Sequence, residues 1–181
     1  APAHTEMYNG SSWTEVNNLN TGRRALAGAG ATYTAALGFG GYDPLRAQTE
    51  TWNGTNWTEV NDLNTARGRF AGCGTNTAAL GFGGYSPPSP AADNETETWN
   101  GTNWTEVNNL NTARAYLGGC GTNTAALAFA GAPAGGGATE LYNGTNWTEV
   151  NDLNTARNQL GAAGTSTAAL GFGGYNPPNL Y

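Results

Sequence analysis

Short apolar segments alternate with polar turn sequences along the whole chain, and this arrangement repeats. No stretch shows sustained helical spacing of apolar positions, and the 28 Gly residues are too frequent for helices. In the second full copy, the pattern predicts short strands over residues 70–75, 78–84, 96–99 and 104–108. Asn100-Gly101 separates the last two and suits a two-residue hairpin, because both positions tolerate positive φ angles. The pattern therefore predicts an all-β fold.

One segment, WTEVNDLNTAR, accounts for most of the repetition. It begins at Trp57 and recurs nearly unchanged from Trp13, Trp104 and Trp147, so that the four Trp residues are 44, 47 and 43 residues apart. From Trp147 through the C-terminus, and on from the N-terminus to Trp13, the count is 47 residues. The chain thus contains four units of similar size, one of them divided between its two ends. Capping repeats, which an open solenoid needs, are not visible, and we therefore expect a closed ring.

The order of Gly pairs and aromatic residues within each unit resembles the kelch motif. In the second copy the motif is carried by Phe82-Gly83-Gly84, Trp99 in the third strand, Trp104 in the fourth and Arg114 beyond it. The third copy departs from the motif, with Ala130-Gly131 at the Gly pair and Ala132 where the other copies have Tyr. The resemblance covers essentially the whole chain. It implies that each unit is a four-stranded blade of a β-propeller.

A four-bladed propeller is the fold that we expect, as a single domain over residues 1–181. The predicted blades are approximately 25–67, 69–114, 116–157, and 159–181 combined with 1–22, with residues 5–20 pairing with 160–175 to close the ring. Kelch propellers commonly have six or seven blades. Units of about 45 residues, shorter than the roughly 50 of kelch repeats, and inner strands of almost pure Gly and Ala favour a narrow four-bladed ring. The alternative is a pair of chains that together form an eight-bladed ring.

A narrower resemblance is to kelch-like repeat proteins of marine phages, particularly those that infect cyanobacteria. The sequences of residues 142–147, 153–157 and 167–174 are similar to those repeats. Such proteins are usually regarded as virion components, often associated with the tail. The resemblance implies a virion or extracellular location and brings no catalytic motif with it.

Composition excludes several classes of protein. Lys is absent and His4 is the one His, so neither a phosphate-binding loop nor a two-His zinc motif can be formed. A net charge of −6 with seven Arg residues argues against nucleic acid as a partner. The longest small apolar run, 125–138, is too short and too weakly hydrophobic for membrane insertion. We expect no metal and no cofactor, and a chain that has been processed, trimmed or excised from a longer one.

The rim formed by the loops after the second and fourth strands is the predicted ligand-binding surface. The loops after the second strands contain 7, 11, 7 and 11 residues, so the blades differ most on this rim. The candidate ligand-binding residues are Tyr42, Tyr85, Tyr175, Arg67, Arg114 and Arg157. Aromatic platforms beside Arg and Asn suit neutral or acidic sugars. The alternative interpretation is that each Arg pairs with a Glu of the repeat and each Tyr covers a blade edge.

Other repeated polar residues are predicted to be structural. The Thr-Asn-Thr turns and the Asn-Gly hairpins on the opposite face are explained by turn chemistry, although such an array could also bind glycans. Eight of the nine Glu residues recur with the repeat, which gives four similar environments instead of the two different ones that an acid–base pair needs. Cys73 and Cys120 occupy a position that is Ala in the other copies, so we expect small buried thiols.

These observations predict a non-enzymatic module that recognises a surface glycan or another virion protein. It would act as a monomeric ring or as a homo-oligomer. A purely structural decoration or assembly module is the second hypothesis, and a glycan hydrolase is the third, because no asymmetric set of acid, base and nucleophile is visible.

Overall fold

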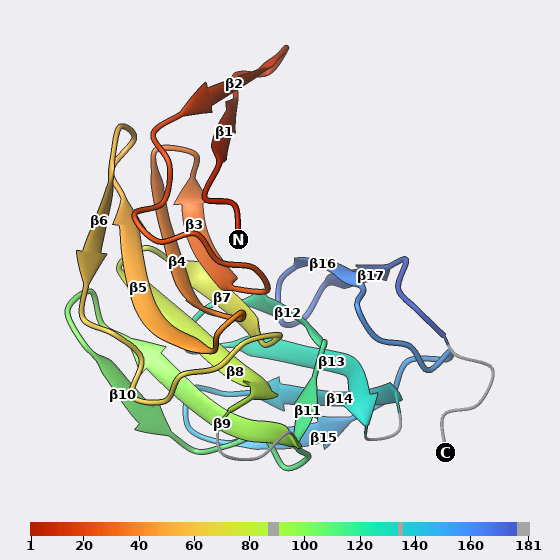
Figure 1. Cartoon of the computed structure of the whole chain (residues 1–181). Coiled ribbons are helices and arrows are strands. Elements are labelled where there is room, and N and C mark those ends of the chain that lie inside the picture. The colour runs from red at the N-terminus through yellow and green to blue at the C-terminus, as the bar shows by residue number, and fades with distance from the viewer. Residues whose placement is uncertain (87–90, 134–135, 177–181) are drawn as a thin grey trace.

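The computed structural model describes residues 1–86, 91–133 and 136–176, and these residues form strands and loops without a helix. Three antiparallel sheets follow one another along the chain (Figure 1). The first contains β3 (Ala27–Thr32), β4 (Ala35–Gly41), β5 (Arg46–Trp52) and β6 (Trp57–Val60). The second contains β7 (Ala71–Thr75), β8 (Ala78–Tyr85), β9 (Ala92–Trp99) and β10 (Trp104–Val107). The third contains β12 (Gly118–Gly121), β13 (Ala126–Pro133), β14 (Gly136–Tyr142) and β15 (Trp147–Val150), with β11 (Arg114–Ala115) also paired to β13.

Four strands of each sheet form a meander, as the repeat predicts, and the third sheet has β11 in addition. The predicted strands of the second copy are confirmed, and β9 begins four residues earlier than expected. The successive four-stranded sheets are consistent with a β-propeller-like fold. Their first strands, β3, β7 and β12, lie side by side along the inner side of the arc.

Glycine and phenylalanine together explain how closely neighbouring sheets pack. The ring of Phe39 on β4 lies against Gly72 on β7, where a Cβ atom would be only 2.6 Å from the ring. The ring of Phe82 lies in the same way against Gly119 on β12, at 2.5 Å. The inner strands are therefore rich in Gly because the aromatic side chain of the preceding sheet occupies the space of a Cβ atom.

The repeated Gly pair after the Phe of the second strand is a β-bulge in the structure. The strand register shifts between Phe39 and Gly41 in the first sheet, and at the equivalent place in the other two sheets. Gly40 has a φ of 64°, and Ala130, its equivalent in the third sheet, has a φ of 65°. The departure of the third copy from the motif thus keeps the same backbone conformation, at the cost of strain for a residue with a Cβ atom.

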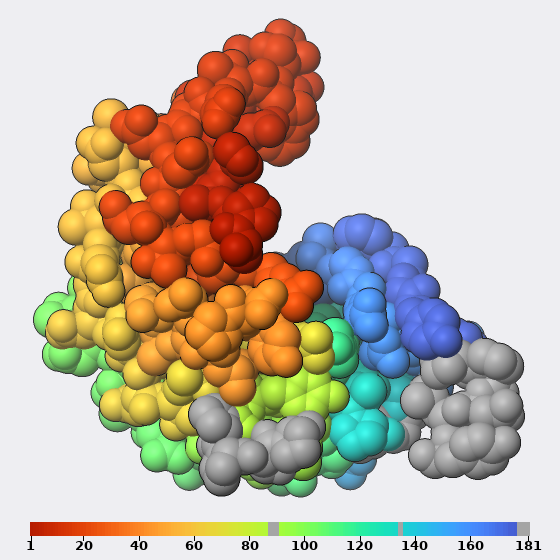
Figure 2. Space-filling view, in the orientation of Figure 1, coloured from red at the N-terminus to blue at the C-terminus, as the bar shows by residue number. Residues whose placement is uncertain are grey.

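The two ends of the chain form half-sheets that remain apart. At the N-terminus β1 (Thr5–Tyr8) pairs with β2 (Trp13–Val16), and at the C-terminus β16 (Gly161–Gly164) pairs with β17 (Ala169–Phe172). Among the described residues neither half-sheet pairs with another strand. Figures 1 and 2 show open space between the two half-sheets. The arc is open in this structure, so the four-bladed ring stays a prediction.

Candidate functional site

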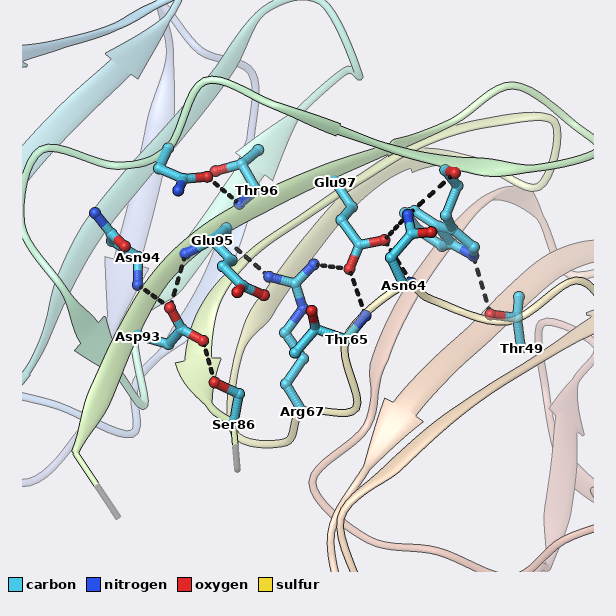
Figure 3. Close-up of polar contacts among 12 residues, drawn as sticks. Thr49, Asn64, Thr65, Arg67, Ser86, Asp93, Asn94, Glu95, Thr96 and Glu97 are labelled. Carbon is cyan, nitrogen blue, oxygen red and sulfur yellow. Dashed lines mark hydrogen bonds and ion pairs between the residues drawn. The ribbon is translucent and has the colours of Figure 1, made fainter. Parts of the chain in front are cut away.

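The segments that follow β2, β6 and β10 each contact the next sheet through a buried ion pair. Arg67 follows β6, and its guanidinium donates a hydrogen bond to Oε1 of Glu97 on β9 at 2.6 Å (Figure 3). Oε2 of Glu97 accepts hydrogen bonds from the backbone N and from Nδ2 of Asn64, both at 2.8 Å. Arg67 also donates to the backbone oxygen of Glu95 at 2.8 Å. We call this group of Arg, Asn and Glu the clamp.

The clamp occurs at each of the three complete sheets. Its ion pairs join Arg23 to Glu50 at 2.6 Å, Arg67 to Glu97 at 2.6 Å and Arg114 to Glu140 at 2.8 Å. All three guanidinium groups are buried, and burial lowers the pKa of Arg67 while the carboxylate of Glu97 opposes that shift. The buried charges lie in matched pairs, which limits the cost of removing them from water.

Two of the predicted ligand-binding arginines, Arg67 and Arg114, therefore lie inside the protein. Their side chains have no exposed surface, and their charges are paired with glutamates of the repeat. The alternative interpretation, that the repeated Arg pairs with a repeated Glu, describes both residues. Arg157 is half-buried and donates to the backbone oxygen of Gly171 at 3.1 Å. Among the described residues it forms no ion pair with a carboxylate.

Tyr42 and Tyr85 lie together on the predicted rim, around a residue that the sequence analysis did not single out. The guanidinium carbon of Arg69 lies 4.5 Å from the ring centre of Tyr42, 4.9 Å from that of Tyr116 and 5.7 Å from that of Tyr85. The rings of Tyr85 and Tyr116 also meet edge to face, with centres 5.8 Å apart. We call Arg69 and these three tyrosines the Arg69 cluster.

All four side chains of the Arg69 cluster are half-buried, so parts of their surfaces face solvent. Among the described residues the Arg69 guanidinium forms no ion pair. A guanidinium over aromatic faces is held there by cation–π attraction. The cluster thus presents a cation with a fixed orientation, surrounded by aromatic surface.

Backbone hydrogen bonds fix the position of Arg69 and Tyr116. The backbone N of Arg69 donates to the oxygen of Ala25 at 2.9 Å, and the backbone N of Tyr116 donates to the oxygen of Arg69 at 2.8 Å. Gln159 continues the series with a bond of 2.9 Å to Tyr116. These four residues occupy the same position of the repeat, and all have φ between 53° and 60°. The signal that sequence reasoning missed is that this position, two residues after an Arg that every copy has, differs in all four copies.

Tyr175 lies outside the Arg69 cluster. Its backbone exchanges two hydrogen bonds with Asn158, as Tyr85 does with Gly68, so it occupies the equivalent place on the rim. Its side chain is exposed and belongs to the C-terminal half-sheet. Parts of the two predicted 11-residue loops, residues 87–90 and 177–181, lie outside the described residues.

The opposite face shows the predicted turn chemistry. Thr75 Oγ1 accepts a hydrogen bond from the backbone N of Ala78 at 3.1 Å. Oδ1 of Asn100 accepts bonds from the backbone N of Thr102 and Asn103, both at 2.9 Å, which closes the hairpin. The Thr and Asn side chains of this face therefore satisfy their own turns.

The remaining reactive residues form no catalytic constellation among the described residues. Cys73 and Cys120 are free, buried thiols, and burial raises the pKa of Cys73 to about 12. His4 is exposed and lies 3.2 Å from a carboxylate oxygen of Glu15. Within the described part of the chain, no three His, Cys, Asp or Glu side chains are grouped so that they could hold a metal ion. The described residues also contain no helix that could span a membrane.

Comparison with known proteins does not identify a family for this chain. The chain matches no protein-family model, and no curated protein matches it.

Proposed function

We propose that this protein is a non-enzymatic binding module that recognises glycans carrying a carboxylate, and that the Arg69 cluster is the binding site. The observation that carries the proposal is a partly exposed guanidinium held between three tyrosine rings. A sugar ring packs its C–H surface on an aromatic face, while a guanidinium binds a carboxylate through two parallel hydrogen bonds. One uronate or sialate residue would use both kinds of surface.

The distribution of charge supports an acidic ligand at this place. The protein carries a net charge of −6, and three of its seven arginines are neutralised by glutamates in the clamps. Arg24 forms an ion pair with Asp43 at 3.1 Å. Among the described residues Arg69 forms no ion pair, so it offers a local positive charge to a carboxylate on an otherwise acidic protein.

The repeated carboxylates support a binding role over hydrolysis. Glu50, Glu97 and Glu140 are held as ion pairs by the clamp arginines. Glu106, which lies opposite Glu97 in the strand pair, is exposed. A retaining or inverting glycosidase places two carboxyl groups in different environments across a bound sugar, and the copied pairs do not provide this asymmetry.

The fold that we propose is a propeller of kelch-like blades in which the two terminal half-sheets share one blade. Within one chain, such sharing gives the four-bladed ring that the sequence predicts. Between chains, it gives a larger ring. A location on a virion or on a cell exterior, where acidic glycans are displayed, fits this proposal.

Binding measurements with matched glycans test the proposed function. An array of acidic and neutral glycans identifies a ligand, and titration with the best acidic oligosaccharide and with its methyl ester isolates the role of the carboxylate. We expect Arg69→Gln to weaken binding of the acid by at least about tenfold, and to have little effect on the weaker binding of the ester. Tyr85→Ala should weaken both.

Thr77→Ala on the opposite face is the control and should bind as the original protein does. The proposal fails if no acidic glycan binds, or if Arg69→Gln binds the acid as tightly as the original protein. Weaker binding by Thr77→Ala alone would move the site to the Thr and Asn face.

A further inference from the structure

Each contact between neighbouring sheets inserts a tryptophan of one sheet into the sheet before it. Trp104 lies 4.7 Å from Phe39, measured between ring centres, and its indole donates a hydrogen bond to Thr49 Oγ1 at 3.0 Å. Trp147 repeats this arrangement with Phe82 and Thr96, at 5.0 Å and 3.2 Å. Both indoles are buried. The contact is thus the same at two successive junctions of complete sheets.

At the C-terminal end of the arc, the corresponding space is a cavity. It has a volume of about 150 Å³ and is lined by Leu127, Phe129, Thr139, Leu153 and their neighbours. These residues are the repeat equivalents of the ones around Trp104. The fourth tryptophan of the repeat, Trp13 on β2, lies at the other end of the arc and is 66% exposed. The cavity and the exposed fourth tryptophan are at opposite ends of one chain.

At the C-terminal end, the aromatic residue of β17 is a side chain without its packing partner, and the matching surface lies at the N-terminal end. Phe172 is 52% exposed, whereas its equivalents in the complete sheets are at most 2% exposed. Two of these equivalents, Phe39 and Phe82, pack on glycines of the next inner strand, Gly72 and Gly119. The matching glycine on the first inner strand, Gly28, has only a backbone oxygen of Leu37 within 4 Å of its Cβ position. It lines an open groove with Gly38 and Trp57.

The charges at the two ends are also complementary. Arg23 donates to the backbone oxygen of Gly38 and to Glu50, and Arg157 makes the equivalent bond to Gly171. The repeat equivalent of Glu50 is Glu6, which is exposed on β1. Pairing β17 with β1 in the register of β4 with β5 places Gly171 opposite Glu6, and this would complete a fourth clamp.

We propose that the C-terminal half-sheet of one chain binds the N-terminal half-sheet of a second copy. β16–β17 of one chain and β1–β2 of the other then form a four-stranded sheet, with Trp13 in the cavity and Glu6 paired with Arg157. The contact joins different surfaces of the two copies, so repetition gives a ring if the rotation closes and a filament if it does not. Two copies that close on each other form a ring of eight sheets.

A second copy fits better than the chain's own other end because of the shape of the arc. The two half-sheets are separated by open space (Figure 2), although all three clamps are already formed. Closure within one chain has to change the rotation at the formed junctions together. A second copy completes both ends without changing any of them, and it pairs the open edges of β1 and β17, which sheet proteins otherwise protect.

Charge exchange between the ends provides the test. The mass of the 18.6 kDa chain in solution is measured by light scattering after size-exclusion chromatography, over a range of concentrations. We expect a mass of two or more chains, and quenching of fluorescence shows whether Trp13 is buried. Glu6→Arg and Arg157→Glu should each weaken association by at least about tenfold. Glu15→Gln, on the same hairpin and exposed, is the control, because it places no positive charge opposite Glu6, and it should leave association unchanged.

Mixing the two charge variants separates the alternatives. An equimolar mixture of Glu6→Arg and Arg157→Glu restores association if the contact is between chains, because every interface then joins opposite charges. Closure within one chain predicts a monomer with Trp13 buried. In that case each single variant loses the closed form, and only the double variant Glu6→Arg/Arg157→Glu restores it. That result overturns the proposal, as does a monomer with Trp13 exposed at every concentration. The outcome is independent of glycan binding.

Discussion

Removing the carboxylate from a clamp is expected to destabilise the fold strongly. In Glu97→Gln the side chain keeps its shape, but the guanidinium of Arg67 becomes a buried charge without its ion-pair partner. Three hydrogen bonds lose the negative charge of their acceptor: the bond of 2.6 Å from Arg67 and the two bonds of 2.8 Å from Asn64. Breaking one side of a buried ion pair costs about 3–5 kcal/mol. For a chain of this size, that lowers Tm by about 6–20 °C.

Urea denaturation followed by tryptophan fluorescence measures this loss. Glu106→Gln is the matched control, because Glu106 lies opposite Glu97 in the strand pair and is exposed, and it should change the free energy of unfolding by less than about 0.5 kcal/mol. Combining Glu97→Gln with Arg67→Met should cost less than the sum of the two single variants, since they share one interaction. If Glu97→Gln is as mild as the control, the buried pair does not hold neighbouring sheets together and the argument from the clamp is refuted.

Two further predictions concern the core and the bulges. Cys73→Ala should cost about 1 kcal/mol or less of unfolding free energy, because Ala occupies this position in two other copies. The native thiol, with its pKa raised to about 12, should resist alkylation at pH 8 until urea unfolds the protein. Rapid labelling of the folded protein would contradict the burial of Cys73. Gly40→Ala should be more destabilising than Gly83→Ala by denaturant titration. Both new methyl groups would lie close to a backbone oxygen, at 2.7 Å from that of Arg67 and at 2.6 Å from that of Arg114, but only Gly40→Ala also meets a rigid ring, that of Phe70 at 2.6 Å. Equal losses would show that the backbone contact and the backbone strain, which both variants share, decide the cost.

The repeat predicts the strands and their order because each unit contains its own turn signals. An Asn-Gly pair follows the third strand of each unit, and in the copy at Asn100-Gly101 the Asn side chain closes the turn locally. The rotation between sheets is different in kind, because it depends on how rings such as Phe39 and Trp104 pack across the junction. Counting repeats therefore gives the number of units, while the curvature of the arc and the distance between its ends become visible only in three dimensions.

The candidate site could be predicted in part for the same reason. Tyr42 and Tyr85 were expected on one rim from the loops that they begin, and the structure places both beside Arg69. The place of Arg67 and Arg114 after the fourth strand predicts that they lie on the rim. In the structure their long side chains instead reach the next sheet and pair with its glutamates. Burial of a long polar side chain is decided by its partner, which one strand's sequence does not show.

The series of backbone hydrogen bonds through Ala25, Arg69, Tyr116 and Gln159 has a consequence for how this protein can change. The bonds that join successive linkers use only main-chain atoms, so these bonds form whichever residue occupies the position. Four different residues already occupy it, all with a positive φ. If the proposed function is right, substitution here would change the ligand preference while these backbone bonds remain. It is the position at which a randomised library should first be placed if the protein is to be engineered as a binder.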